Sequence, residues 1–100
     1  MKKTKVRADY KGEGQKLLRI SAVISAGRIE RIGIAGDFFL HPEEAIFLLE
    51  DSLRGARISE ISERVQRFLQ KGGVFALGIT PEGIQKAVEL GLSEAKMRKS

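Results

Sequence analysis

The sequence predicts an α+β domain in which a three-stranded antiparallel meander is followed by three helices packed on the sheet. Two patterns carry this prediction. Apolar and polar residues alternate through the first third of the chain, as half-buried strands require. After Pro42 the apolar residues recur at helical spacing, in three segments separated by glycine or proline. Consecutive strands joined by short glycine-containing turns most simply form a meander.

Three strands are expected, over residues 4–10, 16–25 and 28–35. The turn at Gly12-Glu13-Gly14 is superficially like a phosphate loop, but such a loop opens a helix, whereas here a second strand follows. A hairpin turn is therefore the better interpretation. The residues expected on the buried face of the sheet are Val6, Ala8, Tyr10, Leu18, Ile20, Ala22, Ile24, Ile32 and Ile34.

The segment from Gly36 to Glu44 marks the change from strand to helix. Pro42 fits the first turn of a helix, where its missing N–H costs nothing. The apolar run of residues 38–40 is too hydrophobic for a solvent-exposed loop and should pack in the core between the sheet and the helices. A packed corner is one interpretation. In the other, Asp37 beside the aromatic pair helps to shape or orient a site, and spacing alone does not choose between them.

The first helix is expected over residues 42–54. Its inner face should carry Ala45, Ile46, Leu48, Leu49, Ser52 and Leu53. Phe47 falls on the opposite, charged face, where an aromatic side chain is either a partner's anchor or one of the single apolar residues common on surfaces.

Two further helices are expected. Ser59 is a credible N-cap for a helix reaching about Gln70. Residues 74–79 could form a strand or a buried connector. Thr80-Pro81-Glu82 then has the cap, proline and acid that begin a helix. Gly91 lies within that last helix, where it either admits a close neighbour or marks an early end, and residues 96–100 are expected to fray.

The composition indicates one domain spanning residues 1–100. The absence of cysteine excludes disulfides, thiolate nucleophiles and cysteine-ligated metals. No apolar run resembles a signal peptide or a membrane span, so we expect a cytoplasmic protein without membrane contact. The lack of Asn and Trp beside abundant Lys, Arg, Glu and Ile is weakly typical of thermophiles.

Positive charge is concentrated at the start of the chain. Residues 1–19 hold seven of the eighteen basic side chains and two acids, which accounts for the whole net charge of +5. Such a strand and hairpin could meet phosphates or an acidic partner. Equally, the lysines could protect an edge strand against pairing with another chain. The sequence leaves both interpretations open.

Catalytic machinery is not visible in the sequence. His41 is the single histidine, and it is more typical of a cap or packing residue than of a base or ligand. No metal-ligand spacing is found. These residues alone indicate a small basic module that acts by binding. We predict no catalytic residues and no metal site.

Several stretches resemble the C-terminal accessory domain of lipoate-protein ligases, and the resemblance extends over about residues 5–92. They are Lys16-Leu17-Leu18-Arg19-Ile20, Ala26-Gly27-Arg28-Ile29, Gly36-Asp37-Phe38-Phe39-Leu40-His41-Pro42-Glu43-Glu44 and Gly78-Ile79-Thr80-Pro81-Glu82. The most specific part is the Gly-Asp-Phe-Phe corner. Gln15 departs from the pattern, since many relatives have glycine there.

The resemblance implies an α+β fold similar to sulfur-transfer and iron–sulfur scaffold proteins. It also implies an accessory subunit that pairs with a separate catalytic subunit as a heterodimer. The pair would use ATP, with Mg²⁺, to activate lipoate to lipoyl-AMP before transfer to a lysine of an acceptor domain or H protein. The family's catalytic lysine and nucleotide-binding motif lie in the large chain, so this chain would not be an enzyme alone.

Two sets of residues follow as hypotheses. Lys11, Lys16 and Arg19 are expected to face the nucleotide. The expected partner interface is formed by Asp37, Phe38, Phe39 and Phe47. The alternatives are a small nucleic-acid-binding module that uses the basic hairpin, which the shortage of free aromatics disfavours, and a structural homo-oligomer joined through Phe47.

Overall fold

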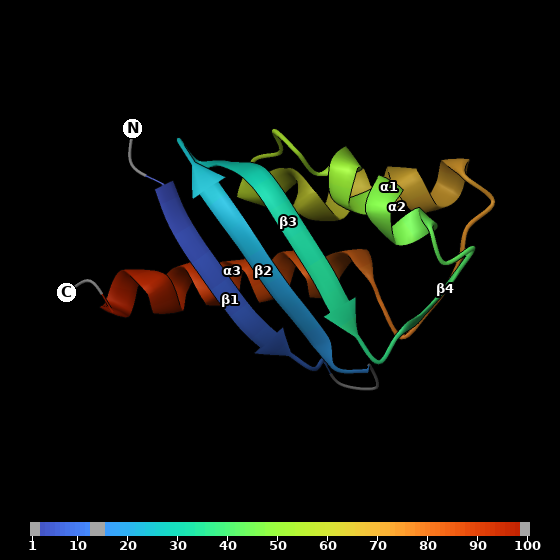
Figure 1. The fold of residues 1–100 in the computed structure, drawn as a ribbon, viewed down its shortest axis with the longest axis horizontal. Helices are drawn as coiled ribbons and strands as arrows, with labels where there is room; N and C mark the ends of the chain where they lie inside the picture. The colour runs from blue at the N-terminus through green and yellow to red at the C-terminus, as the bar shows by residue number, and fades with distance from the viewer. Residues whose placement is uncertain (1–2, 13–15, 99–100) are drawn as a thin grey trace.

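The computed structural model describes residues 3–12 and 16–98, which form an α+β arrangement (Figure 1). Three strands come first: β1 (Lys3–Tyr10), β2 (Leu18–Ser25) and β3 (Arg28–Gly36). They pair antiparallel in the order β1-β2-β3, so the meander is confirmed. Residues 13–15, which include Gln15 and most of the turn expected at residues 12–14, lie outside the described residues.

A second sheet of two strands was not expected. β4 (Phe39–His41) pairs antiparallel with β5 (Phe75–Leu77), although the two strands are far apart in sequence. Residues 74–79 therefore contribute a strand, one of the two possibilities that the sequence left open. Figure 1 shows β4 beyond the end of β3, at the opposite end of the molecule from the last turns of the C-terminal helix.

The helices pack against one face of the three-stranded sheet and against β3. The described residues contain α1 (Ala45–Ser52), the short 3-10 turn η1 (Ile58–Glu60), α2 (Ile61–Lys71) and α3 (Pro81–Arg98). α3 crosses behind β1 and β2 and covers one face of the sheet, while α1 contacts β3 (Figure 1). α2 packs mainly against α3 and α1. The expectation that all three helices pack on the sheet is therefore only partly right.

The core forms where the sheet meets these helices. The inward faces expected from the alternation of β1, β2 and β3 are confirmed, with Tyr10 only half-buried. Gly91 is buried in the middle of α3, where a Cβ would lie 3.3 Å from the carbonyl oxygen of Arg7 and 3.4 Å from the Cβ of Ala8. Gly91 thus admits a close neighbour, the backbone of β1, and does not end the helix.

The start of α1 differs from the expectation. The helix begins at Ala45 and not at Pro42, because residues 39–41 are used in β4 and a turn follows at residues 43–44. Leu48 was expected on the inner face, but 62% of it is exposed. The helix is rotated so that Glu50 turns toward β3, where its carboxylate accepts a hydrogen bond from the Ile34 N–H at 2.8 Å.

At the remaining helix ends, two expectations are wrong and one is confirmed. Ser59 is not an N-cap, because η1 precedes α2 and the Glu60 carboxylate accepts a hydrogen bond from the Arg57 N–H at 2.9 Å. The Thr80 cap is confirmed, since its hydroxyl oxygen accepts a hydrogen bond from the Gly83 N–H at 3.0 Å. α3 continues to Arg98, so the expected fraying at residues 96–98 is wrong.

Substitution of Gly91 tests the packing of α3 on β1. We expect Gly91→Val to destabilise the fold by about 1–3 kcal/mol, because the new side chain must displace the β1 backbone. Chemical denaturation monitored by circular dichroism measures this loss. Lys86→Val, at an exposed position of the same helix, controls for a β-branched residue and should cost less than about 0.7 kcal/mol. Equal losses at both positions would contradict the close packing.

Glu60 in the η1 turn should make the stability of the fold depend on pH. The hydrogen bond from the Arg57 N–H, and secondarily the charges of Arg64 and Arg28, hold the pKa of Glu60 below its ordinary value of 4.5. A carboxylate with a lowered pKa stabilises the fold above its unfolded-state pKa, and this contribution is lost as the pH falls. We therefore expect Glu60→Gln to lower the urea midpoint at pH 7 and to have a smaller effect at pH 3. The same effect at both pH values would contradict this account.

Candidate functional site

Gly36 fixes the corner between β3 and β4. A Cβ at this position would lie only 2.2 Å from the carbonyl oxygen of Leu17, so no other residue fits without moving the backbone. The following N–H, that of Asp37, donates a hydrogen bond to the same oxygen at 3.0 Å. The Gly-Asp-Phe-Phe corner is thereby held against the chain that enters β2, next to Lys16.

Lys16 lies over the connection between β5 and α3. Its Cγ is 2.7 Å from the position that a Cβ on Gly78 would occupy, and the Cα of Phe38 is 3.5 Å from that position. Lys16 is nevertheless exposed, so its aliphatic stem covers Gly78 while the residue still faces solvent. Three segments that are distant in sequence therefore meet at Gly78. Lys11, directly after β1, is exposed as well.

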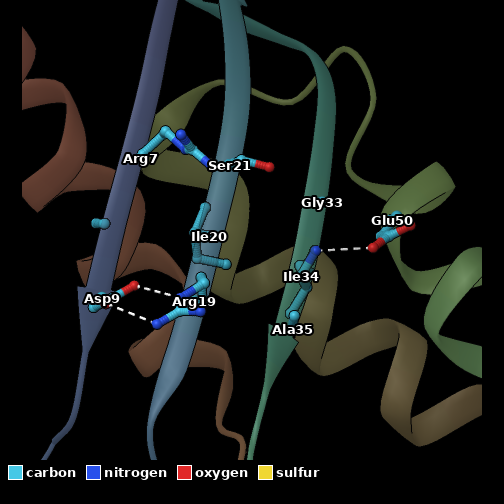
Figure 2. A pocket seen from close by; sticks show the side chains of 10 residues that line it. Arg7, Asp9, Arg19, Ile20, Ser21, Gly33, Ile34, Ala35 and Glu50 are labelled. Carbon is cyan, nitrogen blue, oxygen red and sulfur yellow. Dashed lines mark hydrogen bonds and ion pairs between the residues drawn. The ribbon is translucent and has the colours of Figure 1, made fainter.

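Arg19 differs from the two lysines because its charge is already shared. Figure 2 shows its guanidinium reaching across from β2 to Asp9 on β1, with Nε–Oδ1 and Nη2–Oδ2 distances of 2.9 and 3.2 Å. These hydrogen bonds hold the pKa of Asp9 below its usual range. The hydrogen bonds to Asp9 raise the pKa of Arg19, and the nearby charge of Asp37 raises it further. Of the three basic residues expected to face a nucleotide, Arg19 is the one that is paired.

The face of the sheet opposite α3 carries a shallow hollow of ≈ 510 Å³. Its floor is formed by small residues in register on adjacent strands, Ser21 and Gly33, and Arg7 and Arg19 rise beside them (Figure 2). Glu50 of α1 closes the β3 side. Sequence reasoning did not find Glu50, because only the rotation of α1 turns it toward the sheet.

The four residues expected at a partner interface are divided by the structure. Phe38 is half-buried and packs against the core, whereas Phe39 and Asp37 are exposed. The expectation that the whole run of residues 38–40 plugs the core is therefore wrong for Phe39, because successive residues of β4 point to opposite faces. Phe47 lies on the solvent side of α1 and is 66% exposed.

Phe39 belongs to an apolar surface that the sequence did not reveal. It lies opposite Leu77 in the β4–β5 ladder, and His41 lies opposite Phe75. Directly paired residues share one face of a sheet, and all four side chains are exposed. We call this surface, formed by Phe39, His41, Phe75 and Leu77, the ribbon face. The two large apolar residues two positions apart, Phe75 and Leu77, were a signal for it, but the partner strand could not be foreseen.

Residues 3–12 and 16–98 contain no group of three or more His, Cys, Asp or Glu side chains placed to hold a metal ion. In the same part of the chain, no helix combines the length and the apolar character needed to cross a membrane.

Comparison with known proteins identifies the family. No model of a known protein family matches the chain. Over 74 residues it is 38% identical to lipoate-protein ligase A subunit 2 of Thermoplasma acidophilum. The aligned residues cover 74% of this chain and 78% of that protein. The fold matches a chain from a structure of an archaeal lipoylation system of the same organism, comprising a bi-partite lipoate protein ligase and its E2 lipoyl domain. That match has a TM-score of 0.75 and 33% identity, and covers 87% of this chain and 97% of the other. The chain therefore belongs to the family of lipoate-protein ligase A subunit 2.

Proposed function

We propose that this chain is the accessory subunit of a two-chain lipoate-protein ligase, required with a catalytic subunit for the ATP-dependent activation of lipoate to lipoyl-AMP. The observation that carries the proposal is the 38% identity to a ligase subunit 2 of which the chain covers 78%. The bi-partite ligase in the matched structure supports a heterodimer. A lysine of an acceptor domain or H protein then receives the lipoyl group, so these proteins are indirect partners.

In this proposal the chain supplies no catalytic residue. ATP, lipoate and the Mg²⁺ that accompanies ATP belong to the complex. The small subunit closes over the bound nucleotide, which excludes water and strengthens the stabilisation that each cationic donor gives to the negative charge developing on the phosphate oxygens. Lys11 and Lys16 are the candidate donors, because both are exposed at one end of the sheet. Arg19 is the weaker candidate, since Asp9 already shares its charge.

The corner at residues 36–39 keeps a positioning role in this proposal. The Asp37 N–H bond to Leu17 holds the corner against the chain beside Lys16, so docking through the corner would also set the position of that lysine. Asp37, Phe38, Phe39 and Phe47 remain the proposed partner contacts, with Phe38 acting mainly by supporting its neighbours from the core. Similarity to sulfur-transfer and iron–sulfur scaffold folds also remains a prediction.

Reconstitution tests the function. We expect the pair to form lipoyl-AMP from ATP and lipoate at least about tenfold faster than the catalytic subunit alone, because closure completes the electrostatic environment of the phosphate. Pyrophosphate release measures the rate. Transfer from supplied lipoyl-AMP to an acceptor should depend much less on the small subunit. An unchanged adenylation rate would contradict the proposal, and salt-sensitive binding to oligonucleotides would then favour a nucleic-acid-binding module.

Charge reversal at Lys16 tests the nucleotide-facing role. Lys16→Glu keeps the Cβ and Cγ atoms that cover Gly78, so the fold should be retained while adenylation by the saturated pair falls by about tenfold or more. Lys5→Glu makes the same change of net charge at an exposed position in the middle of β1. It should change the rate by less than about twofold. Equal losses for the two variants would indicate general attraction by the basic segment and not a local contact.

A further inference from the structure

The ribbon face presents large apolar side chains to solvent. Phe39, Phe75 and Leu77 are 51%, 54% and 57% exposed. The opposite face of the same two strands explains the pairing, because Leu40 is buried and Ala76 packs against the core. Nothing in the fold of an isolated chain requires apolar residues on the outward face as well.

The size of this surface is that of a functional patch. A buried aromatic side chain covers about 150–250 Å², so half-exposed side chains leave roughly 100 Å² each. Phe39, Phe75 and Leu77 therefore expose roughly 300 Å² of contiguous apolar surface, the range in which the largest patch of a monomer often serves an interaction. Half of a standard interface is about 800 Å². The ribbon face is thus large enough for the centre of an interface, which a polar rim would complete.

The rings of the ribbon face hold one another in place. The Phe39 ring stacks on His41 with centroids 6.4 Å apart and packs edge-on against Phe75 at 6.1 Å. Mutual contact restricts the rotamers before any partner arrives, which lowers the entropy lost on binding. Rigid aromatic residues near the centre of a patch are the usual energetic anchors of an interface.

The neighbourhood of the ribbon face indicates its occupant. Gly78 directly follows Leu77, and the stem of Lys16 lies on it. A partner seated on the ribbon face would therefore meet Lys16 at the rim, the residue proposed to face a nucleotide. The chain itself belongs to a family of second subunits. Both observations favour the nucleotide-binding catalytic subunit over a second copy of this chain.

We propose that the ribbon face is the surface through which this chain docks on the catalytic subunit, with Phe75 and Leu77 as anchors in an apolar groove of that subunit. The inference rests on the proposed function and adds to it a surface, an orientation and two anchor residues. Docking in this orientation brings the β1–β2 end of the sheet, including Lys16, to the boundary between the two chains.

The test is the affinity of the pair, measured by isothermal titration calorimetry. Phe75→Ser/Leu77→Ser should raise the Kd by at least about 30-fold, since truncating an anchor costs about 2 kcal/mol or more. Met97→Ser is the matched control. Met97 is 72% exposed in the last turn of α3, and the last turns of α3 lie at the opposite end of the molecule from β4 (Figure 1). Its substitution should change the Kd by less than about twofold. In adenylation assays a saturating concentration of the double variant should restore the rate, because docking and not chemistry is impaired.

The outcomes separate this inference from the function on which it rests. If the wild-type pair neither binds nor accelerates adenylation, the proposed function fails. If the wild-type pair binds and the double variant binds equally well, the docking surface is wrong while the function stands. Circular dichroism checks the fold, and Phe75→Lys serves if the double variant does not fold. The proposal would also be overturned if the wild-type chain formed a homodimer and the double variant lost this homodimer while it still bound the catalytic subunit normally.

Discussion

The close approach of Gly36 to the Leu17 carbonyl is the constraint on which the candidate site depends. A side chain at residue 36 would strike that oxygen at 2.2 Å, so the backbone of β3 can turn there only because the residue is glycine. The turn directs the chain out of the three-stranded sheet and into β4. With the Asp37 N–H bonded to the same oxygen, the corner is fixed relative to the chain that carries Lys16.

The two-stranded sheet of β4 and β5, which follows this corner, gains its stability from the core beneath it. An isolated two-stranded ribbon is marginal in water, and here Leu40 and Ala76 on its inner face pack against the hydrophobic core. The outer face is then free to carry aromatic side chains for a partner. The open face of the three-stranded sheet has a different character, because its cations are interleaved with acids such as Asp9 and Glu50. One end of the molecule thus combines exposed apolar residues with a lysine, while on the open face Arg19 is paired with Asp9.

The sequence was sufficient for the parts of the fold that depend on local pattern. Alternation predicted β1, β2 and β3, and the cap and proline at Thr80-Pro81 predicted the start of α3, because these signals lie within a few residues of one another. The pairing of β4 with β5 joins segments more than thirty residues apart, and no local pattern encodes that. The rotation of α1, which exposes Leu48 and turns Glu50 to Ile34, likewise depends on the edge of β3. For the same reason the sequence identified Phe39 but missed Phe75 and Leu77.

Methyl NMR of this chain, titrated with unlabelled catalytic subunit, tests whether the ribbon face is the docking surface. Leu77 reports on the ribbon face, and Val23 lies among the residues that line the open face of the sheet. Leu90, on α3, reports on the helical side. We expect the Leu77 methyl signals to shift or broaden on binding, while those of Val23 and Leu90 keep their positions. A complex in which Val23 or Leu90 responds and Leu77 does not would contradict it.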